Sequence, residues 1–200
     1  MTRFACVVLA GGLSRRMGGI KKYDQILAGK PLLQHVLDRL RPQTSSLVVN
    51  AAIPIDYRDI NVIPDVIEGQ LGPLAGVHAG LQFYAPSRGE ATHLLVCPCD
   101  VPFLPADLMQ KLSAGLTGTD NEIVMASSDG RLHPVISLWP FSLLDELGAA
   151  LKNGENQSVI GFAEQYKIVK VSWESKEDPF FNINTPEDLA LAETRAEGVC

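Results

Sequence analysis

The sequence contains no long apolar stretch and no excess of positive charge. Its 200 residues include 17 Lys and Arg against 23 Asp and Glu, a formal net charge of −6 at pH 7. No apolar run approaches the roughly 18 to 20 residues of a membrane-spanning helix, and a nucleic acid or an acidic membrane surface would require a basic face. We therefore expect a cytoplasmic protein that binds neither a membrane nor a nucleic acid and that meets any anionic ligand locally.

Cysteine is scarce, and two common phosphate-binding motifs are missing. No second close pair of Cys or His residues accompanies Cys97 and Cys99 to complete a tetrahedral zinc site, so we interpret these cysteines as small buried apolar residues. The Gly-x-x-x-x-Gly-Lys-Ser/Thr spacing of a Walker A loop does not occur, and neither does the Gly-x-Gly-x-x-Gly dinucleotide pattern. A serine-hydrolase elbow and a Cys/His nucleophile arrangement are also absent.

Segments with strand character alternate with segments of helical periodicity, which is typical of an α/β domain with a mostly parallel sheet. Strands are predicted over residues 4–9, 46–50, 61–63, 92–97, 122–126, 133–138 and 167–173. Helices are predicted over residues 31–41, 107–116, 142–152 and 158–165, with one more ending near Tyr84 and another beginning after Thr185. The strand over 92–97 is the most apolar and is expected at the centre. A turn over residues 127–130 predicts a small antiparallel portion.

The stretch LAGGLSRRMGGIKK, residues 9–22, places glycines and cations directly after the first predicted strand. Its glycines are Gly11, Gly12, Gly18 and Gly19, and its cations are Arg15, Arg16, Lys21 and Lys22. Glycines let backbone amides approach a ligand closely, and local positive charge on an acidic protein favours phosphate or nucleotide binding. The alternative is a solvated turn with surface cations. A second Gly-rich turn, residues 69–76, precedes the helix that ends near Tyr84.

Polar residues follow several predicted strands at their carboxyl ends, where open parallel sheets bind ligands. They are Asn50, Asp65 and Asp100. Because Pro98 and Pro102 restrict the loop around Asp100, this carboxylate can serve as a hard oxygen ligand for magnesium, although an Asx-type cap of the loop is the alternative. Asp65 is equally compatible with a ligand contact and with a turn.

Asn182 and Asn184 bracket Ile183 before the last predicted helix. Spacing by two would put both amides on one face, beside a helix N-terminus that favours an anion, while Thr185 and Asp188 form a capping box. Capping explains Asn184 and Thr185 but not Asn182. His133, which precedes Pro134 on a predicted strand, is interpreted as a hydrogen-bonded core or hairpin residue rather than a catalytic one.

Taken in order, these motifs resemble the molybdenum cofactor guanylyltransferases. The resemblance runs from about Phe4 to Leu189 and comprises Leu9–Gly12, Arg16–Gly19, Lys22, Asn50, Asp65, Gly72–Gly76, Cys97–Asp100, His133–Pro134 and Asn182–Glu187. It implies a single three-layer α/β/α nucleotidyltransferase domain over residues 1–200, with a Rossmann-like sheet. It further implies transfer of GMP from magnesium GTP to molybdopterin with release of pyrophosphate, and partners that could include molybdoenzyme apoproteins or their chaperones.

The same resemblance implies roles for individual residues. The nucleotide would be held by Leu9, Ala10, Gly11, Gly12, Lys22, Asn50, Asp65 and Gly72. Asp100 would hold magnesium and would act in catalysis together with Lys22 and Arg16. Asn182 and Asn184 lie where the family receives the pterin cofactor.

The chain departs from the family pattern at two places, and two other functions stay open. Lys21 stands where the family commonly has an acidic residue, and the arginines that some relatives place around residues 156–158 are missing. A transferase that uses CTP, or that acts on a sugar phosphate, is one alternative. Gly11 and the Gly72–Gly76 loop favour GTP, since cytidylyl relatives usually carry alanine at the position of Gly11 and have a different loop in place of Gly72–Gly76. A non-catalytic module that binds and delivers the cofactor is the other.

Overall fold

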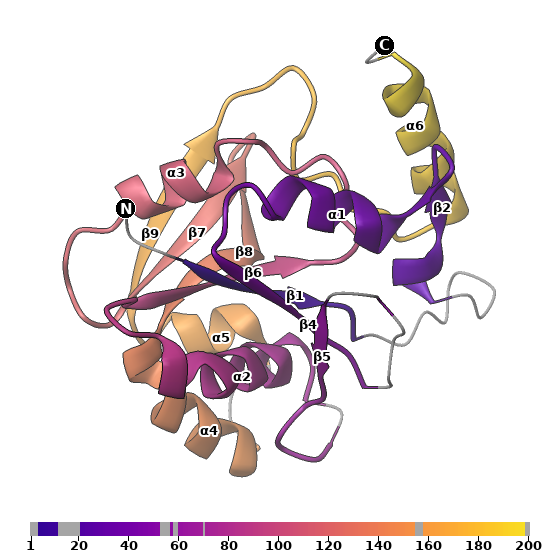
Figure 1. Cartoon of the computed structure of the whole chain (residues 1–200). Helices are drawn as coiled ribbons and strands as arrows, with labels where there is room; N and C mark the ends of the chain where they lie inside the picture. Colours follow the sequence, from indigo (N-terminus) through magenta and orange to yellow (C-terminus); the bar gives the residue numbers. More distant parts are fainter. Residues whose placement is uncertain are drawn as a thin grey trace.

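The computed structural model describes residues 4–11, 21–52, 57, 60–69, 71–154 and 158–198. Seven strands form one mixed sheet in the order β5-β4-β1-β6-β8-β7-β9 (Figure 1). Their bounds are β1 (Ala5–Leu9), β4 (Ser46–Asn50), β5 (Asn61–Ile63), β6 (His93–Pro98), β7 (Glu122–Ser128), β8 (Arg131–Pro140) and β9 (Lys167–Trp173). Within this sheet β8 pairs antiparallel with β6 and β7, whereas the other neighbours pair parallel. The predicted mostly parallel sheet with a small antiparallel portion is confirmed, and β6 is its central strand.

Helices cover both faces of the sheet, which confirms the three-layer α/β/α arrangement (Figure 1). The helices are α1 (Leu32–Leu40), α2 (Pro73–Tyr84), α3 (Leu108–Ala114), α4 (Leu144–Lys152), α5 (Val159–Ala163) and α6 (Pro186–Glu197). Successive side chains of a strand point to opposite faces. Accordingly Cys6 and Val8 belong to the core cluster under α1 and α3, while Val7 and Leu9 belong to the cluster under α2, α4 and α5.

The last helix packs away from the main sheet, against a small hairpin. Strands β2 (Ile26–Leu27) and β3 (Lys30–Pro31) pair antiparallel, and Leu27 shares a third apolar cluster with Ile183 and Ala192. In Figure 1, α6 lies beside β2, on the same side of the sheet as α1. No helix in the described part of the chain combines the length and the apolar character of a membrane span.

The structure corrects two predicted boundaries. The second Gly-rich turn ends at Gly72, because Pro73 already occupies the first helical position of α2, which proline favours; Gly76 therefore lies inside the helix. The turn predicted over residues 127–130 is also shorter. Ser127 and Ser128 pair with β9 and extend β7, so Asp129 and Gly130 alone form the turn, both with positive φ.

The strands that carry the predicted site end in one row. Leu9 is paired with Asn50 on one side and with Pro98 on the other, and Asn50 is paired with Ile63. Because neighbouring strands lie about 4.8 Å apart, the row from β5 to β6 spans roughly 14 Å. The polar residues that follow these strands consequently share one edge of the sheet.

Candidate active site

At this edge of the sheet, backbone hydrogen bonds continue one residue beyond the ends of β1 and β6. The Ala10 N–H donates to the Asn50 carbonyl over 2.8 Å, and the Cys99 N–H donates to the Leu9 carbonyl over 3.0 Å. Gly11 follows and is exposed. The chain thus leaves β1 as an ordered extension toward solvent, at the place where the sequence predicts that backbone groups meet a nucleotide.

Asn50 and Asp65 form one unit at the outer end of the row. Asn50 is 4% exposed, and its Nδ2 donates to Oδ1 of Asp65 over 2.9 Å and to the Ile63 carbonyl over 3.4 Å. Asp65 itself is exposed. Asn50 therefore acts as a buried support that orients an exposed carboxylate.

Lys22, Asp100 and Asn184 converge at the other end of the row, after the central strand. The Nζ of Lys22 lies 2.7 Å from Oδ2 of Asp100 and also donates to Oδ1 of Asn184. Lys22 belongs to a short 3-10 helix, Lys22–Asp24, whose Tyr23 is buried in the core. Asp100 is only 8% exposed. One cation is held between two oxygen atoms that come from distant parts of the chain.

This pair of oxygens suits a hard cation. A carboxylate and an amide carbonyl are ligands that magnesium accepts, and magnesium usually keeps several waters and binds substrate phosphates in addition to one or two protein oxygens. Among the described residues, no three or more His, Cys, Asp or Glu side chains gather into a metal-binding group. Asp100 and Asn184 would fill two coordination positions of the ion and leave the others to water and phosphate. The Lys22 ammonium already lies between these two oxygens, so this place accommodates a positive charge.

The segment that carries Asn182 and Asn184 is anchored by backbone and side-chain contacts. The Ile183 N–H donates to the Asp100 carbonyl over 3.0 Å, and the capping box of α6 is present as predicted, with Thr185 accepting from the Asp188 N–H. The segment is not a strand, yet fully buried Ile183 separates two partly exposed asparagines. Asn184 therefore reaches Lys22, while Asn182 lies two residues away on the same segment.

A second anchor of this segment is a chain of three polar side chains. The Ser128 hydroxyl donates to Oδ1 of Asp178 over 2.7 Å, and Nε2 of His133 lies 2.7 Å from the same hydroxyl oxygen. Because the single hydroxyl proton goes to Asp178, His133 donates from Nε2. Burial lowers the pKa of His133, Asp178 opposes this effect and Arg131 adds to it. His133 is thus a hydrogen-bonded hairpin residue, as predicted.

Comparison with known proteins identifies the family. The family model for the MobA-like NTP transferase domain matches residues 6–169. The chain belongs to the MobA-like NTP transferase family. It is 44% identical over 194 residues to a molybdenum cofactor guanylyltransferase of Bradyrhizobium sp. (strain ORS 278), with 95% of this chain and 92% of that protein covered. A relative of the same name from Rhodopseudomonas palustris (strain BisB5) is 45% identical over 191 residues, covering 94% and 91%.

A solved structure agrees with this assignment. The crystal structure of molybdopterin-guanine dinucleotide biosynthesis protein A from Archaeoglobus fulgidus has a TM-score of 0.76 and 26% identity, covering 98% of this chain and all of that one. The predicted resemblance to the molybdenum cofactor guanylyltransferases and the nucleotidyltransferase fold are therefore confirmed. As a MobA-like NTP transferase, the protein is a nucleotidyltransferase enzyme.

The structure brings most, but not all, of the predicted residues together at this edge of the sheet. The residues that lie along the row or beside its central end are Leu9, Ala10, Gly11, Asn50, Asp65, Lys22, Asp100, Asn182 and Asn184. Gly72 caps the N-terminus of α2 with φ +70°. Gly12 and Arg16 lie outside the described residues, as do residues 155–157. Lys21 points elsewhere, with its Nζ 5.7 Å from the Tyr23 ring centroid.

Sequence reasoning missed Ser128 and Asp178. Ser128 was assigned to a turn, and Asp178 lies 50 residues further along the chain in a stretch without a motif. The only local signal was His133 itself, whose partner could have been sought among the hydroxyls of the hairpin. No pattern in the sequence points from His133 to Asp178.

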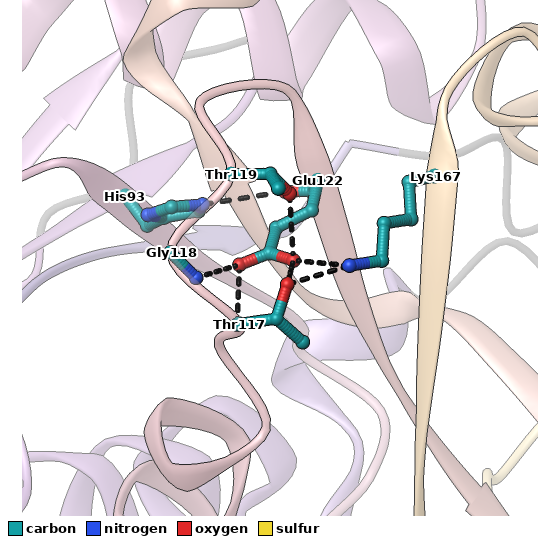
Figure 2. Close-up of polar contacts among 6 residues, drawn as sticks. All are labelled: His93, Thr117, Gly118, Thr119, Glu122 and Lys167. Carbon is teal, nitrogen blue, oxygen red and sulfur yellow. Dashed lines mark hydrogen bonds and ion pairs between the residues drawn. The ribbon is translucent and has the colours of Figure 1, made fainter.

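A separate polar cluster surrounds Glu122 at the opposite edge of the sheet. Figure 2 shows the carboxylate accepting from the Thr117 and Gly118 N–H groups and from the Thr117 and Thr119 hydroxyls. The carboxylate is buried, and Nζ of Lys167 lies 3.4 Å from it. Burial alone would raise the pKa of Glu122, but the hydrogen bonds from Thr117, Thr119 and Gly118 lower it to about 2. Glu122 and Lys167 begin β7 and β9, so this cluster joins the starts of two strands and lies at the other end of the sheet from Lys22, Asp100 and Asn184.

Proposed function

We propose that the protein transfers GMP from magnesium GTP to molybdopterin, forming molybdopterin guanine dinucleotide and pyrophosphate. The observation that carries this proposal is the meeting of Lys22, Asp100 and Asn184 at the central end of a row that also holds Asn50 and Asp65. A nucleotide laid along this edge would have its phosphates at Lys22 and its nucleoside end toward Asp65. The relatives are named molybdenum cofactor guanylyltransferases, and this name is the reason for choosing GTP as the donor and molybdopterin as the acceptor.

The reaction needs positioning and charge neutralisation more than covalent catalysis. A terminal phosphate oxygen of molybdopterin forms a bond to the α-phosphorus of GTP, and the bond from that phosphorus to the pyrophosphate oxygen breaks. Both reactants are anions, so bringing them together in line is the main task of the protein. Lys22 neutralises phosphate charge, and Asn182 and Asn184 face the acceptor.

Asp100 and Asn184 would hold magnesium, which supplies further charge neutralisation on the phosphates of the donor. Lys22, whose ammonium both oxygens share in this structure, would then contact the phosphates. Its side chain is partly exposed, so this change requires no opening of the core. Asp100 keeps its position because its backbone carbonyl accepts from Ile183.

A nucleotide panel tests the proposal. The purified protein is incubated with molybdopterin, magnesium and GTP, CTP, ATP or UTP in turn, and pyrophosphate and the dinucleotide product are measured. We expect product with GTP and little with the others. Preference for CTP would assign the protein to the cytidylyl alternative, and nucleotide binding without pyrophosphate release would indicate a delivery module.

A further inference from the structure

The Asn50 amide lies in contact with helix α2 at Gly76. A methyl group added to Gly76 would stand 2.4 Å from Oδ1 and 3.1 Å from Cγ of Asn50, and 2.6 Å from Cδ2 of Leu9. Carbon atoms do not approach neighbours this closely, so any larger residue at this position must move the Asn50 amide or the end of Leu9. Only glycine lets both side chains keep their present places.

Backbone conformation does not explain this glycine. Gly76 is absent from the glycines of positive φ in the described chain and lies inside the helix, where alanine would be more favourable by about 1 kcal/mol. Glycine lowers the stability of the helix here and is not required by the backbone dihedral angles. Its presence is explained by the lack of room for a larger side chain. The space it leaves is filled by Asn50 and Leu9, two residues of the nucleotide row.

The space matters because Asn50 supports Asp65. Its Nδ2 holds Oδ1 of Asp65 over 2.9 Å, while its Oδ1 faces Gly76 and lies 3.8 Å from where a methyl group on Gly11 would be. The amide therefore sits in a slot between two glycines, one on α2 and one after β1. Pushing the amide out of this slot would displace the exposed carboxylate that it orients.

We propose that Gly76 is a positioning residue that sets the affinity for the nucleoside end of the substrate through Asn50 and Asp65. The inference rests on the proposed function, because it takes the Asn50 end of the row as the nucleoside subsite. Asp100 follows β6, two strands away from Asn50 on β4. A change at Gly76 should therefore weaken binding of GTP but leave binding of inorganic pyrophosphate unchanged.

Gly80 is a matched control, one helical turn further along α2. A methyl group there would lie 2.7 Å from Cγ1 of Val7 and 2.9 Å from Cδ2 of Leu94, which are apolar core atoms. The two glycines share a helix and the sheet face against which it packs. Gly80→Ala thus perturbs packing without touching the Asn50 amide.

The experiment measures Kd for GTP and for pyrophosphate by calorimetry, with magnesium, for the unaltered protein, Gly76→Ala, Gly80→Ala, Asn50→Ala and the double variant Gly76→Ala/Asn50→Ala. We expect Gly76→Ala to weaken GTP binding at least tenfold and pyrophosphate binding less than twofold. Gly80→Ala should lower Tm but keep GTP affinity within twofold. The double variant should bind GTP as Asn50→Ala does, because the amide is gone and the remaining close contact of the methyl group is Cδ2 of Leu9, the end of a flexible side chain that can move aside.

Equal GTP affinities of Gly76→Ala and Gly80→Ala would overturn the inference, as would additive losses in the double variant. If Gly76→Ala does not fold, the double variant decides: GTP binding equal to that of Asn50→Ala supports the inference, and an unfolded or weaker-binding protein overturns it. GTP binding by the unaltered protein without transfer would overturn the proposed function alone. Absence of GTP binding would overturn both.

Discussion

Nζ of Lys22 lies 2.7 Å from Oδ2 of Asp100, although 78 residues separate them in the chain. The ion pair is partly buried, with the two side chains 29% and 12% exposed. Its members come from the short helix after the Gly-rich stretch and from the end of the central strand. Both charges are thus already gathered at one point of the sheet edge, which is the arrangement that the proposed transfer between two anions would need.

Replacing Asp100 by alanine should abolish most transfer while leaving the fold intact. Loss of one such charged group in a transition state typically lowers the rate by about 10² to 10³. Initial rates of pyrophosphate release, with a circular dichroism spectrum, check this. Asp107→Ala is the control, because the partly exposed Asp107 carboxylate contacts Lys111 and Trp173 rather than Lys22, and this variant should keep its rate. Full activity of Asp100→Ala would refute the catalytic assignment.

Lys22 and Lys21 should behave differently although they are neighbours. Lys22→Met removes the cation between Asp100 and Asn184, and we expect kcat to fall by about 10². Lys21→Met removes only a contact with the Tyr23 ring and should change kcat less than twofold. Steady-state kinetics with GTP and molybdopterin measure both. Equal losses in the two variants would mean that general positive charge, rather than the Lys22 position, is what matters.

Ser128→Ala should weaken use of the acceptor without weakening GTP binding. The variant removes the hydroxyl that joins Asp178 to His133 and leaves Oδ1 of Asp178 with the Phe180 N–H, which loosens the segment that carries Asn182 and Asn184. We expect KM for molybdopterin to rise severalfold and Kd for GTP to stay the same. Ser127→Ala is the neighbouring control, since that hydroxyl contacts β9 through Val171 and Ser172. A purely structural role of Ser128 would lower Tm in both variants and leave KM unchanged.

Glu122 should make stability depend on acidic pH. A carboxyl group whose pKa is about 2 in the folded protein, below its ordinary 4.5, binds a proton more readily when unfolded. Its stabilisation is therefore complete above about 4.5 and is lost as the pH falls from there toward 2. Glu122→Gln leaves buried donors without an acceptor, at a cost of about 1 to 3 kcal/mol, and should flatten this part of the profile.

Thermal unfolding between pH 2 and 7 measures the Glu122 effect. GTP affinity of Glu122→Gln at neutral pH should match that of the unaltered protein, because the carboxylate lies at the opposite edge from Asp100. A profile of Glu122→Gln that parallels the unaltered protein below pH 4.5 would contradict the prediction.

Much of the fold could be predicted because its signals are local. Strands β4, β5 and β9 have the predicted bounds, since each is a short run bordered by polar or turn residues. The capping box of Thr185 and Asp188 depends on residues three apart. The turn at 127–130 was predicted too long because pairing of Ser127 and Ser128 with β9 is a non-local contact.

The sequence by itself determined the family, the α/β class and the polar residues that follow the strands, because motif spacing and apolar periodicity are properties of neighbouring residues. Only the tertiary structure decided that Asp100 and Asn184 share the Lys22 ammonium, that Ser128 holds Asp178, and that Gly76 makes room for Asn50. Each of these contacts depends on which strands and helices lie side by side, and packing distances of this kind have no counterpart in the linear order of the chain.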